Sequence, residues 1–553
     1  MKKSSLLLIG TLFSLLATSC GGSSCNCPAD ENGQKDEVSL EKDPNENYAF
    51  DDASNKNGSM SYEIFVRSFY DSDGNGIGDL NGVKAKLPYL ADLGIKTLWL
   101  MPIHNSPSYH GYDVIDYYTV HPDYGTLNDF DDLVKEANKL NIDIMLDMVF
   151  NHTSTKCDWF TKSYNDYKNN VKTKDSKADW YNWSKSGGDG YSKYGDLYYE
   201  ARFDSSMPDL NWDSANMKAE IDKVFEFWVK NHNVKAFRLD AVRYYYYNET
   251  DKNVEVLTWL ENEGKKYNKD FYMVGEDWAG NSEVLAYHKS ACDSFFKFSS
   301  SLDSGNNDAM LQLIKSNSGI ASYQANDKWA KRIENYEKSV KEANPDAYSS
   351  YFLSNHDMDR ASNSLEECFM KSATSFYGLM PGTPFMYYGE EIGLKGVRNT
   401  SPDDRSDARR RLPMVWSKDD KTGECKFPEK GREDLANNDQ VEDGADDLMQ
   451  VGYSLPNHFK KVINVRNKYP FLKHSVFTNM VSSLNRSDNQ YVLAYKLSLG
   501  SDYIIVVHNF NQYAIEVTSP GTEIVDEINT NRQKPRLKDG KLAIGAYSTV
   551  IMK

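Results

Sequence analysis

The fold of this chain can be worked out from one stretch, residues 235–242, with the sequence KAFRLDAV. Its pattern is that of a short strand in which Phe237 and Leu239 face one side. Arg238 and Asp240 then face the other side. An arginine and a carboxylate on a buried face cost free energy unless they form an ion pair or take part in chemistry. This stretch alone leaves both interpretations open.

Three other stretches carry polar residues where an apolar run ends. They are DMVFNH at 147–152, VGE at 274–276 and SNHD at 354–357. Together with the first stretch they supply the carboxylates Asp240, Glu276 and Asp357, with Asp147, His152 and His356 nearby. Four such runs favour a shared site over an isolated structural ion pair.

The order of the expected elements indicates an α/β barrel. Besides the quoted stretch, strands are predicted at 61–66, 95–100, 142–149, 271–275, 294–298, 351–353 and 385–388, with helices at 83–93, 130–140, 214–230 and 458–467. Alternating strands and helices are typical of parallel βα units, and eight of them close into a (β/α)8 (TIM) barrel. Functional residues of such a barrel lie at the C-terminal ends of its strands, where the polar clusters fall.

Two further domains are expected around the barrel, which is assigned to residues 58–152 and 212–470. Residues 153–211 show no helical or strand period and are rich in Trp and Tyr, which favours a small domain inserted after the third strand over a loop. Residues 471–553 show short alternating strands and predict a C-terminal antiparallel β-sandwich.

The first twenty residues have the pattern of a targeting segment. Two lysines precede an apolar run over 6–16, and small residues at 17–19 lead to Cys20. The run is too short to span a bilayer. It resembles a bacterial lipoprotein signal, which implies a lipid anchor on Cys20 and a place in the cell envelope. A plain secretory signal is the alternative. The acidic stretch 21–57 is expected to be a disordered tether.

Composition narrows the classes of partner. The net charge of −17 disfavours nucleic acid or an anionic bilayer surface as a partner. The 37 tyrosines and 10 tryptophans suit a protein that stacks rings on apolar faces of ligands, although a large aromatic core explains them equally well. Seven scattered cysteines indicate no disulfide framework.

Three carboxylates around one barrel mouth meet the needs of acetal cleavage. The reaction requires an acid to protonate the leaving oxygen, and a second carboxylate to attack the sugar carbon or to activate water. Binding of a divalent metal by the same carboxylates is the main chemical alternative.

At these four motifs, which occur in order, the sequence resembles the α-amylase superfamily, glycoside hydrolase family 13. The resemblance extends from about residue 59 to the C terminus. It implies that Asp240 is the nucleophile, Glu276 the general acid and base, and Asp357 the residue that holds the sugar hydroxyls. A retaining mechanism then predicts a separation of about 5–5.5 Å between the carboxyl groups of Asp240 and Glu276.

The resemblance also implies residues that bind substrate. Tyr112 would stack on the sugar being cleaved, with Asp113 beside it as a second candidate. His152 and His356 would hydrogen-bond the same sugar. Arg238 would orient Asp240 and keep it ionised. The segment RLPMVW at 411–416 resembles one of the α-glucosidase branch and implies that Arg411 lines the cleft.

Residues 71–79, DSDGNGIGD, have the spacing of a calcium loop, with oxygen donors at alternate positions and a glycine at the sixth. The expected Ca²⁺ ligands are Asp71, Asp73, Asn75, the carbonyl of Ile77, and Asp79. The twelfth position is Gly82, so the loop is not an EF-hand. It resembles the metal loop after the first strand of oligosaccharide-acting members, and a turn without metal is the alternative. The resemblance implies a second site at Asn151 and Asp209.

Three features bear on the subgroup. MPDLN at 207–211 is similar to the region that marks members between oligo-1,6-glucosidases and neopullulanases, and Ala241 resembles the α-1,4-acting enzymes. Arg243 replaces the usual lysine. We therefore expect a monomeric, endo-acting α-amylase that cleaves α-1,4 bonds in starch and maltooligosaccharides. An exo-acting α-glucosidase or oligo-1,6-glucosidase, a neopullulanase, and a non-catalytic starch-binding lipoprotein are the alternatives.

Overall fold

The structure is a computed structural model that describes residues 38, 40–50, 60–302, 310, 323–398, 406–428, 441, 443–484 and 492–553. The predicted signal segment, Cys20 and most of the predicted tether lie outside these residues. Within the described part of the chain, no helix is both long and apolar enough to cross a bilayer.

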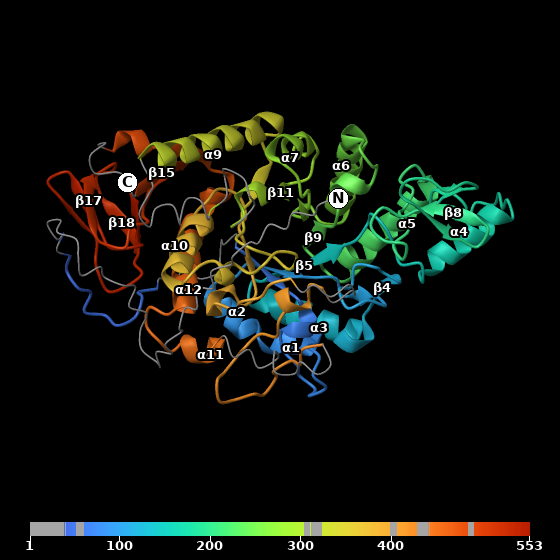
Figure 1. Ribbon diagram of the computed structural model, residues 1–553, viewed down its shortest axis with the longest axis horizontal. Coiled ribbons are helices and arrows are strands. Elements are labelled where there is room, and N and C mark those ends of the chain that lie inside the picture. Colours follow the sequence, from blue (N-terminus) through green and yellow to red (C-terminus); the bar gives the residue numbers. More distant parts are fainter. Residues whose placement is uncertain are drawn as a thin grey trace, which may run out of the picture.

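Eight parallel strands form the central barrel (Figure 1). They are β1 (Ser61–Ile64), β2 (Thr97–Leu100), β5 (Asp143–Met148), β9 (Ala236–Leu239), β10 (Tyr272–Gly275), β11 (Ser294–Phe296), β12 (Tyr348–Ser350) and β13 (Phe385–Tyr387). Their order is β12-β11-β10-β9-β5-β2-β1-β13. Backbone hydrogen bonds from Thr383 N to Ser349 O (3.2 Å) and from Phe385 N to Tyr351 O (2.8 Å) join the two ends of the sheet. The predicted barrel is thus confirmed.

The seventh strand lies three residues earlier than the predicted 351–353. Its two serines are buried, because the Ser349 hydroxyl donates to Glu337 and the Ser350 hydroxyl donates to Ser294. Buried polar residues that are satisfied by distant partners give no apolar signal in the sequence.

Helices cover the outside of the barrel. They are α1 (Leu80–Ala85), α2 (Leu87–Leu93), α3 (Leu127–Lys139), α5 (Ala215–Phe225), α6 (Thr250–Tyr267), α7 (Asn281–Tyr287), α9 (Tyr323–Ala343), α10 (Glu367–Gly378), α11 (Ala445–Leu448) and α12 (Leu455–Lys468). Ser214 and Ser454 cap α5 and α12 by accepting hydrogen bonds from backbone N–H groups. The predicted helix over 83–93 is two short helices that meet at Lys86, and α5 ends in a π-helical turn, Glu226–Asn231.

The inserted segment after β5 folds as a helix beside a small sheet, which we call domain B (residues 153–211; Figure 1, right). The helix is α4 (Asp158–Lys168), and the antiparallel sheet has the order β6 (Trp183–Ser184), β8 (Leu197–Glu200), β7 (Tyr191–Tyr194). The sequence pattern did not predict α4. Its buried positions are Phe160, Ser163 and Asp166, of which only one is apolar, so the helical period is hidden.

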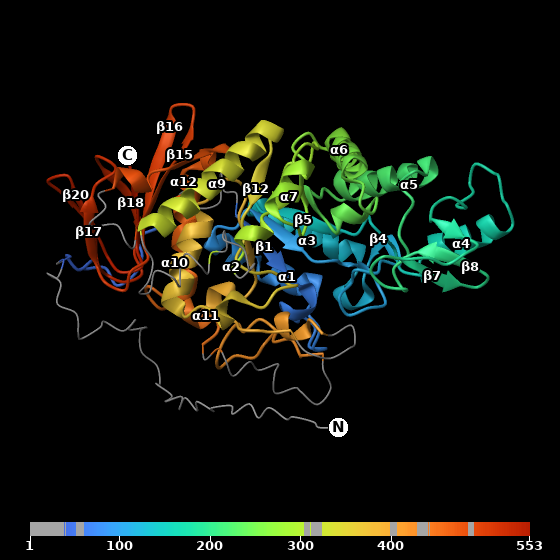
Figure 2. The same ribbon diagram turned by 45° about the horizontal axis from the view of Figure 1, so that its top comes forward.

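The C-terminal domain lies at the end of the molecule opposite domain B (Figure 2). One antiparallel sheet has the order β14 (Val476–Asn479), β15 (Val492–Leu499), β16 (Asp502–Asn509), β21 (Thr549–Met552), β18 (Ile524–Ile528). The second has the order β17 (Ile515–Thr518), β20 (Lys541–Ile544), β19 (Arg536–Lys538). One apolar cluster contains residues of both sheets, including Val507 and Leu542. The sheets therefore share a core.

Residues 40–50 belong to the stretch predicted as a tether, and here the structure differs. Lys42 pairs with Gln533 of the C-terminal domain. Tyr48 is buried, its hydroxyl donating to the carbonyl of Asn529 and lying 2.7 Å from Nδ1 of His458 on α12. This segment therefore connects the barrel to the C-terminal domain.

Replacing Tyr48 by alanine removes a buried ring and leaves His458 and Asn529 without that partner. We expect Tyr48→Ala to lower the free energy of unfolding by about 3 kcal/mol, measured as a lower thermal unfolding midpoint. Phe50→Ala removes a nearby exposed ring and should have a much smaller effect. Equal effects of the two variants would show that the segment does not anchor the C-terminal domain through Tyr48.

Candidate active site

One buried arginine collects three carboxylates at the mouth of the barrel. The sheet register places Arg238 beside Asp147 on β5. Its NH1 donates to Asp147 Oδ1 (2.7 Å) and to Asp240 Oδ1 (2.8 Å). Its NH2 lies 2.8 Å from Glu276 Oε2, which follows β10. Arg238 and Asp240 therefore form an ion pair, and the same arginine also gathers the carboxyl groups that could react.

The chain turns sharply after Asp240, and the turn brings Glu276 close. Ala241 has φ = 49°, a left-handed conformation that costs a non-glycine residue about 1–3 kcal/mol. The turn lets the Ala241 N–H donate to Glu276 Oε2 at 3.2 Å and the Val242 N–H donate to the Glu276 carbonyl at 3.2 Å. These two hydrogen bonds hold Glu276 beside Asp240.

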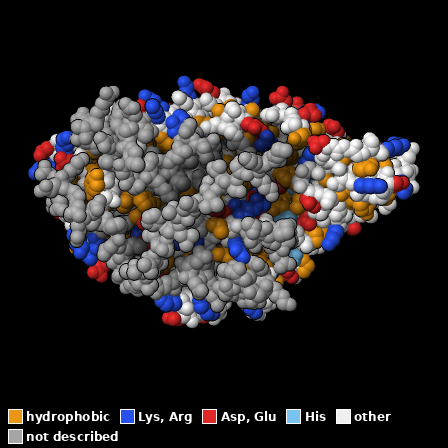
Figure 3. Space-filling view, in the orientation of Figure 1, with side chains coloured by type: hydrophobic (Ala, Val, Ile, Leu, Met, Phe, Trp, Pro, Cys, Tyr) orange, Lys and Arg blue, Asp and Glu red, His pale blue; other side chains and the backbone are white. Residues whose placement is uncertain are grey.

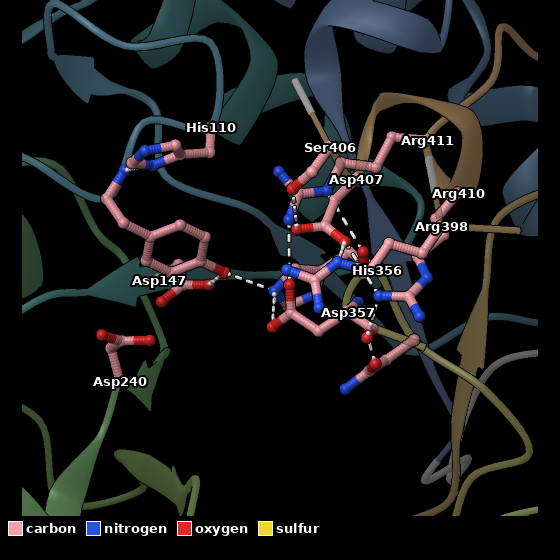
Figure 4. Close-up of polar contacts among 12 residues, drawn as sticks. His110, Asp147, Asp240, His356, Asp357, Arg398, Ser406, Asp407, Arg410 and Arg411 are labelled. Carbon is pink, nitrogen blue, oxygen red and sulfur yellow. Dashed lines mark hydrogen bonds and ion pairs between the residues drawn. The ribbon is translucent and has the colours of Figure 1, made fainter. Parts of the chain in front are cut away.

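A second group of side chains lies beside the first (Figure 4). Tyr112 donates its hydroxyl hydrogen to Asp147 Oδ2 (3.0 Å), and its oxygen lies 2.7 Å from His356 Nε2. His356 Nε2 also lies 3.0 Å from Asp357 Oδ2, and its Nδ1 contacts Glu63. The network therefore runs without a break from Asp240 to Asp357.

Two arginines of the segment after β13 donate hydrogen bonds to Asp357. Arg411 NH2 donates to Asp357 Oδ1 at 2.9 Å. Arg410 NH1 donates to the backbone carbonyl of Asp357 at 2.6 Å and to Asp407 Oδ1 at 2.8 Å, and its Nε donates to Asp359 (Figure 4). Both the side chain and the backbone of Asp357 are held in place.

Burial and charge give the carboxyl groups different protonation behaviour. Burial raises the pKa of Glu276 to about 7, although Arg238 opposes the shift. Burial also raises the pKa of Asp240, against the attraction of Arg238. Arg238 lowers the pKa of Asp240, as expected from the sequence, but desolvation is the larger effect and the net shift is upward.

Asp357 and His356 form an ion pair within the same site. Burial would raise the pKa of Asp357, but His356 and Arg411 outweigh it and hold this pKa well below its usual range. Burial would lower the pKa of His356, but Asp357 and Glu63 raise it to about 10. Both ring nitrogens of His356 are then protonated and donate, while Asp357 stays ionised at neutral pH.

These groups border a cavity of about 450 Å³. Six of the predicted site residues line it, namely Tyr112, His152, Asp240, Glu276, Asp357 and Arg411. Arg243 also lines the cavity. On the face shown in Figure 3, Lys or Arg side chains lie in a central hollow. Arg238 and His356 lie behind the lining, where their contacts are to protein groups. His356, predicted to hydrogen-bond the sugar, contacts Tyr112 and Asp357 in the structure.

Asp113, predicted as a substrate-binding residue, does not line this cavity. Its side chain is buried and accepts hydrogen bonds from the hydroxyls of Ser106 and Ser108. These bonds stabilise the loop that contains the three residues. His152 is held by its backbone neighbours, with Nε2 donating to the Tyr112 carbonyl at 3.0 Å. Burial lowers the pKa of His152 to about 4, so its ring is neutral.

Sequence reasoning missed several lining residues. They are His110, Phe203, Met207, Tyr244, Trp278 and Asp407. Tyr244 and Trp278 follow Asp240 and Glu276 closely along the chain, and that proximity is the one signal that was available for them.

The predicted metal loop brings its acidic residues together. Oxygen atoms of Asp71, Asp73 and Asp79 all lie within 4.8 Å of one another. Asp71 and Asp79 also accept backbone N–H groups, among them those of Gly76 and Gly82, which fixes the loop. A compact set of carboxylate oxygens matches the preference of Ca²⁺.

The implied second metal site is less well supported by its geometry. Asn151 and Asp209 lie together, and the Asn151 amide donates to Asp209 Oδ1 at 3.1 Å, while the buried Asn151 Oδ1 has no hydrogen-bond partner among the described residues. Among the described residues, no further acidic, histidine or cysteine ligand atom completes a cluster there. We propose no second metal site.

Comparison with known proteins agrees with this geometry. Residues 63–475 match the family described as alpha amylase, catalytic domain, and residues 492–551 match the alpha-amylase SusG C-terminal domain. The chain belongs to the α-amylase family, glycoside hydrolase family 13, and is a glycoside hydrolase.

Three relatives illustrate the range of the family around this chain. Alpha-amylase 3 of Dictyoglomus thermophilum is 35% identical over 89% of this chain and 92% of its own. The oligo-1,6-glucosidase of Parageobacillus thermoglucosidasius is 28% identical over 82% and 89%. The solved structure of Eubacterium rectale Amy13B superposes with a TM-score of 0.80 at 34% identity, covering 91% of this chain and 96% of that one.

Proposed function

We propose that this glycoside hydrolase is an endo-acting α-amylase that cleaves α-1,4-glucosidic bonds in starch and maltooligosaccharides with retention of configuration. The observation that carries the proposal is that one buried arginine holds Asp240 and Glu276 together while Glu276 keeps its proton to about pH 7. The relative named alpha-amylase 3 supports α-amylase activity. The relative named oligo-1,6-glucosidase makes exo-acting α-glucosidase activity the second candidate.

The proposed reaction has two steps. In the first, the Asp240 carboxylate attacks the anomeric carbon while Glu276 gives its proton to the departing glycosidic oxygen, which leaves a glycosyl ester on Asp240. In the second, the Glu276 carboxylate takes a proton from water, and the water oxygen attacks the same carbon and releases Asp240. Glu276 ends protonated, as it began.

The neighbouring residues prepare this reaction. Arg238 fixes the orientation of both reacting carboxyl groups through separate nitrogen atoms. Asp357, kept ionised by His356 and Arg411, offers acceptor oxygens to the sugar hydroxyls. The Tyr112 ring, fixed by the hydrogen bonds of its hydroxyl, offers a flat apolar surface to the same sugar.

We also propose that residues 71–79 bind Ca²⁺. Asp71, Asp73 and Asp79 would hold the ion together with Asn75 and the carbonyl of Ile77. The ion would offset the repulsion among the clustered carboxylates and stabilise the loop between β1 and α1.

Substitution of the proposed nucleophile tests the reaction. Asp240→Asn keeps the size of the side chain but removes the attacking charge, so we expect hydrolysis of amylose to be lost. Glu276→Gln should lower kcat by about 10²–10⁴-fold. Asp502→Asn, a change at an exposed acid of the C-terminal domain, is the matched control and should keep full activity. Turnover by Asp240→Asn at the wild-type rate would contradict the assignment.

The pattern of products separates the two candidate functions. Internal cuts in amylose give mixed maltooligosaccharides from the earliest times, whereas exo-acting cleavage releases glucose first. We expect mixed maltooligosaccharides, measured by chromatography of early digests of amylose and pullulan. Early release of glucose alone would favour the second candidate.

The pKa of Glu276 predicts the alkaline limb of the pH profile. Because the acid must be protonated, kcat/KM should fall as pH rises through about 7 and be about 100-fold below its plateau at pH 9. The residual activity of Glu276→Gln should lack this limb. An unchanged limb in that variant would assign the titration to another group.

Calcium binding predicts a metal-dependent unfolding temperature. At a free Ca²⁺ concentration of about 100 times Kd, bound Ca²⁺ should add about 2.7 kcal/mol to the free energy of unfolding. Asp73 is exposed and its other contacts are to Asn75, so Asp73→Asn should remove most of this shift without altering the unfolding temperature in chelator. Asp502→Asn should keep the shift. The same shift in both variants would contradict this site.

A further inference from the structure

Two arginines hold together the segments that follow β12 and β13. Arg360, after β12, donates from Nε to the Arg410 carbonyl at 2.8 Å and from NH1 to the Tyr388 carbonyl at 2.6 Å. Arg410, after β13, donates from NH1 to the Asp357 carbonyl at 2.6 Å. Each arginine therefore binds a backbone carbonyl of the other segment, so neither segment can shift without breaking charged hydrogen bonds.

Arg410 also reaches a carboxylate of the cavity. Its NH1 donates to Asp407 Oδ1 at 2.8 Å, and Asp407 lines the cavity (Figure 4). The Nε atom of Arg398 lies 3.6 Å from the same oxygen. Arg410 itself is not among the described residues that line the cavity, and its side chain is 14% exposed. Any effect of Arg410 on a substrate is therefore passed on by Asp407 and Asp357.

Asp359 sets the orientation of the Arg410 guanidinium. Its Oδ1 accepts hydrogen bonds from Arg410 Nε at 2.8 Å and from the Arg398 N–H at 2.9 Å. A guanidinium is planar and its donors point in fixed directions, so contacts at Nε and at NH1 together fix its plane. Asp359 is half exposed and is not among the described lining residues, so this ion pair contributes direction more than stability.

The backbone of Asp357 is the part of that residue that Arg410 holds. His356 and Arg411 contact the two carboxylate oxygens of Asp357, at 3.0 and 2.9 Å. The Asn355 side chain accepts the Asp357 N–H at 3.0 Å, and Arg410 binds the carbonyl on the other side of the residue. These two backbone contacts set where the carboxylate enters the cavity. A displacement of about 1 Å at a reacting centre can cost about 100-fold in rate.

We propose that Arg410 is a positioning residue of the active site, which sets the places of Asp357 and Asp407 together, and that Asp359 orients it for this role. The segments after β12 and β13 then act as one support for the sugar that is attacked. The inference rests on the glycoside cleavage of the proposed function and deepens it by naming what holds Asp357. It does not depend on whether the cuts are internal or terminal.

Arg410→Ala tests the proposal because it removes the contacts to Asp357, Asp359 and Asp407. We expect kcat to fall about 100-fold and KM to change less, because the displaced carboxylate acts on the sugar that reacts. Arg410→Lys keeps the charge but cannot point its donors at all three acceptors, and should lose about tenfold. Both losses are measured as reducing ends released from amylose. Arg536→Ala, at a half-exposed arginine of the C-terminal domain, is the matched control and should keep the wild-type kcat and KM.

A double-mutant cycle separates positioning from a general loss of structure. Asp359→Asn keeps the size of the side chain but weakens its contact to Arg410, and should lower kcat about threefold. Because Asp359 acts through Arg410, this change should have no further effect when it is added to Arg410→Ala. Additive effects, or a wild-type kcat in Arg410→Ala, would overturn the proposal. If Arg410→Ala does not fold, a wild-type kcat in both Arg410→Lys and Asp359→Asn would overturn it.

The proposed function can fail separately from this positioning role. Release of reducing ends reports internal and terminal cuts alike. If the wild type releases glucose first from amylose, the endo-acting function is wrong, and the Arg410 variants still test the positioning role. If the wild type cuts internally and Asp240→Asn is inactive, a wild-type kcat in Arg410→Ala overturns the positioning role alone.

Discussion

The structure of the active site depends on the charge of Arg238, which is buried among Asp147, Asp240 and Glu276. Three neighbouring strands of the barrel each bring one carboxyl group to this guanidinium, or to the turn just beyond the strand end. A buried cation without its partners is strongly destabilising, by about 3–5 kcal/mol when one partner is removed. The requirement to satisfy Arg238 therefore fixes the register of β5, β9 and β10 and the reacting groups together.

From that arginine, charge and hydrogen bonding extend across the barrel mouth through Tyr112 and His356 to Asp357. The groups share one buried volume but titrate differently, because desolvation dominates at Glu276 while two cations dominate at Asp357. A protonated Glu276 can therefore coexist near neutral pH with an ionised Asp357 in the same site. The difference between the two carboxyl groups arises because His356 and Arg411 both lie beside Asp357.

The two domains outside the barrel lie at opposite ends of the molecule, and of their described residues only those of domain B border the cavity. Domain B adds Phe203 and Met207 to the cavity and joins the segment after β9 through ring contacts. The C-terminal domain lies at the other end of the molecule (Figures 1 and 2), and residues 40–50 attach to it and to α12. Domain B therefore borders the active-site cavity, whereas the C-terminal domain lies away from domain B.

The sequence by itself determined the barrel, its two added domains, and the residues Asp240, Glu276 and Asp357 at its mouth. Each belongs to a short motif at the end of a strand, and strand ends of parallel units meet by topology alone. Only the tertiary structure decided the helix α4, the start of β12 at buried serines, the contacts of Asp113 within its loop, the anchoring by Tyr48, and the contact of Phe203 with Tyr244. These depend on contacts between residues far apart in the chain, such as Phe203 with Tyr244 or Ser349 with Glu337, and no local period records such contacts.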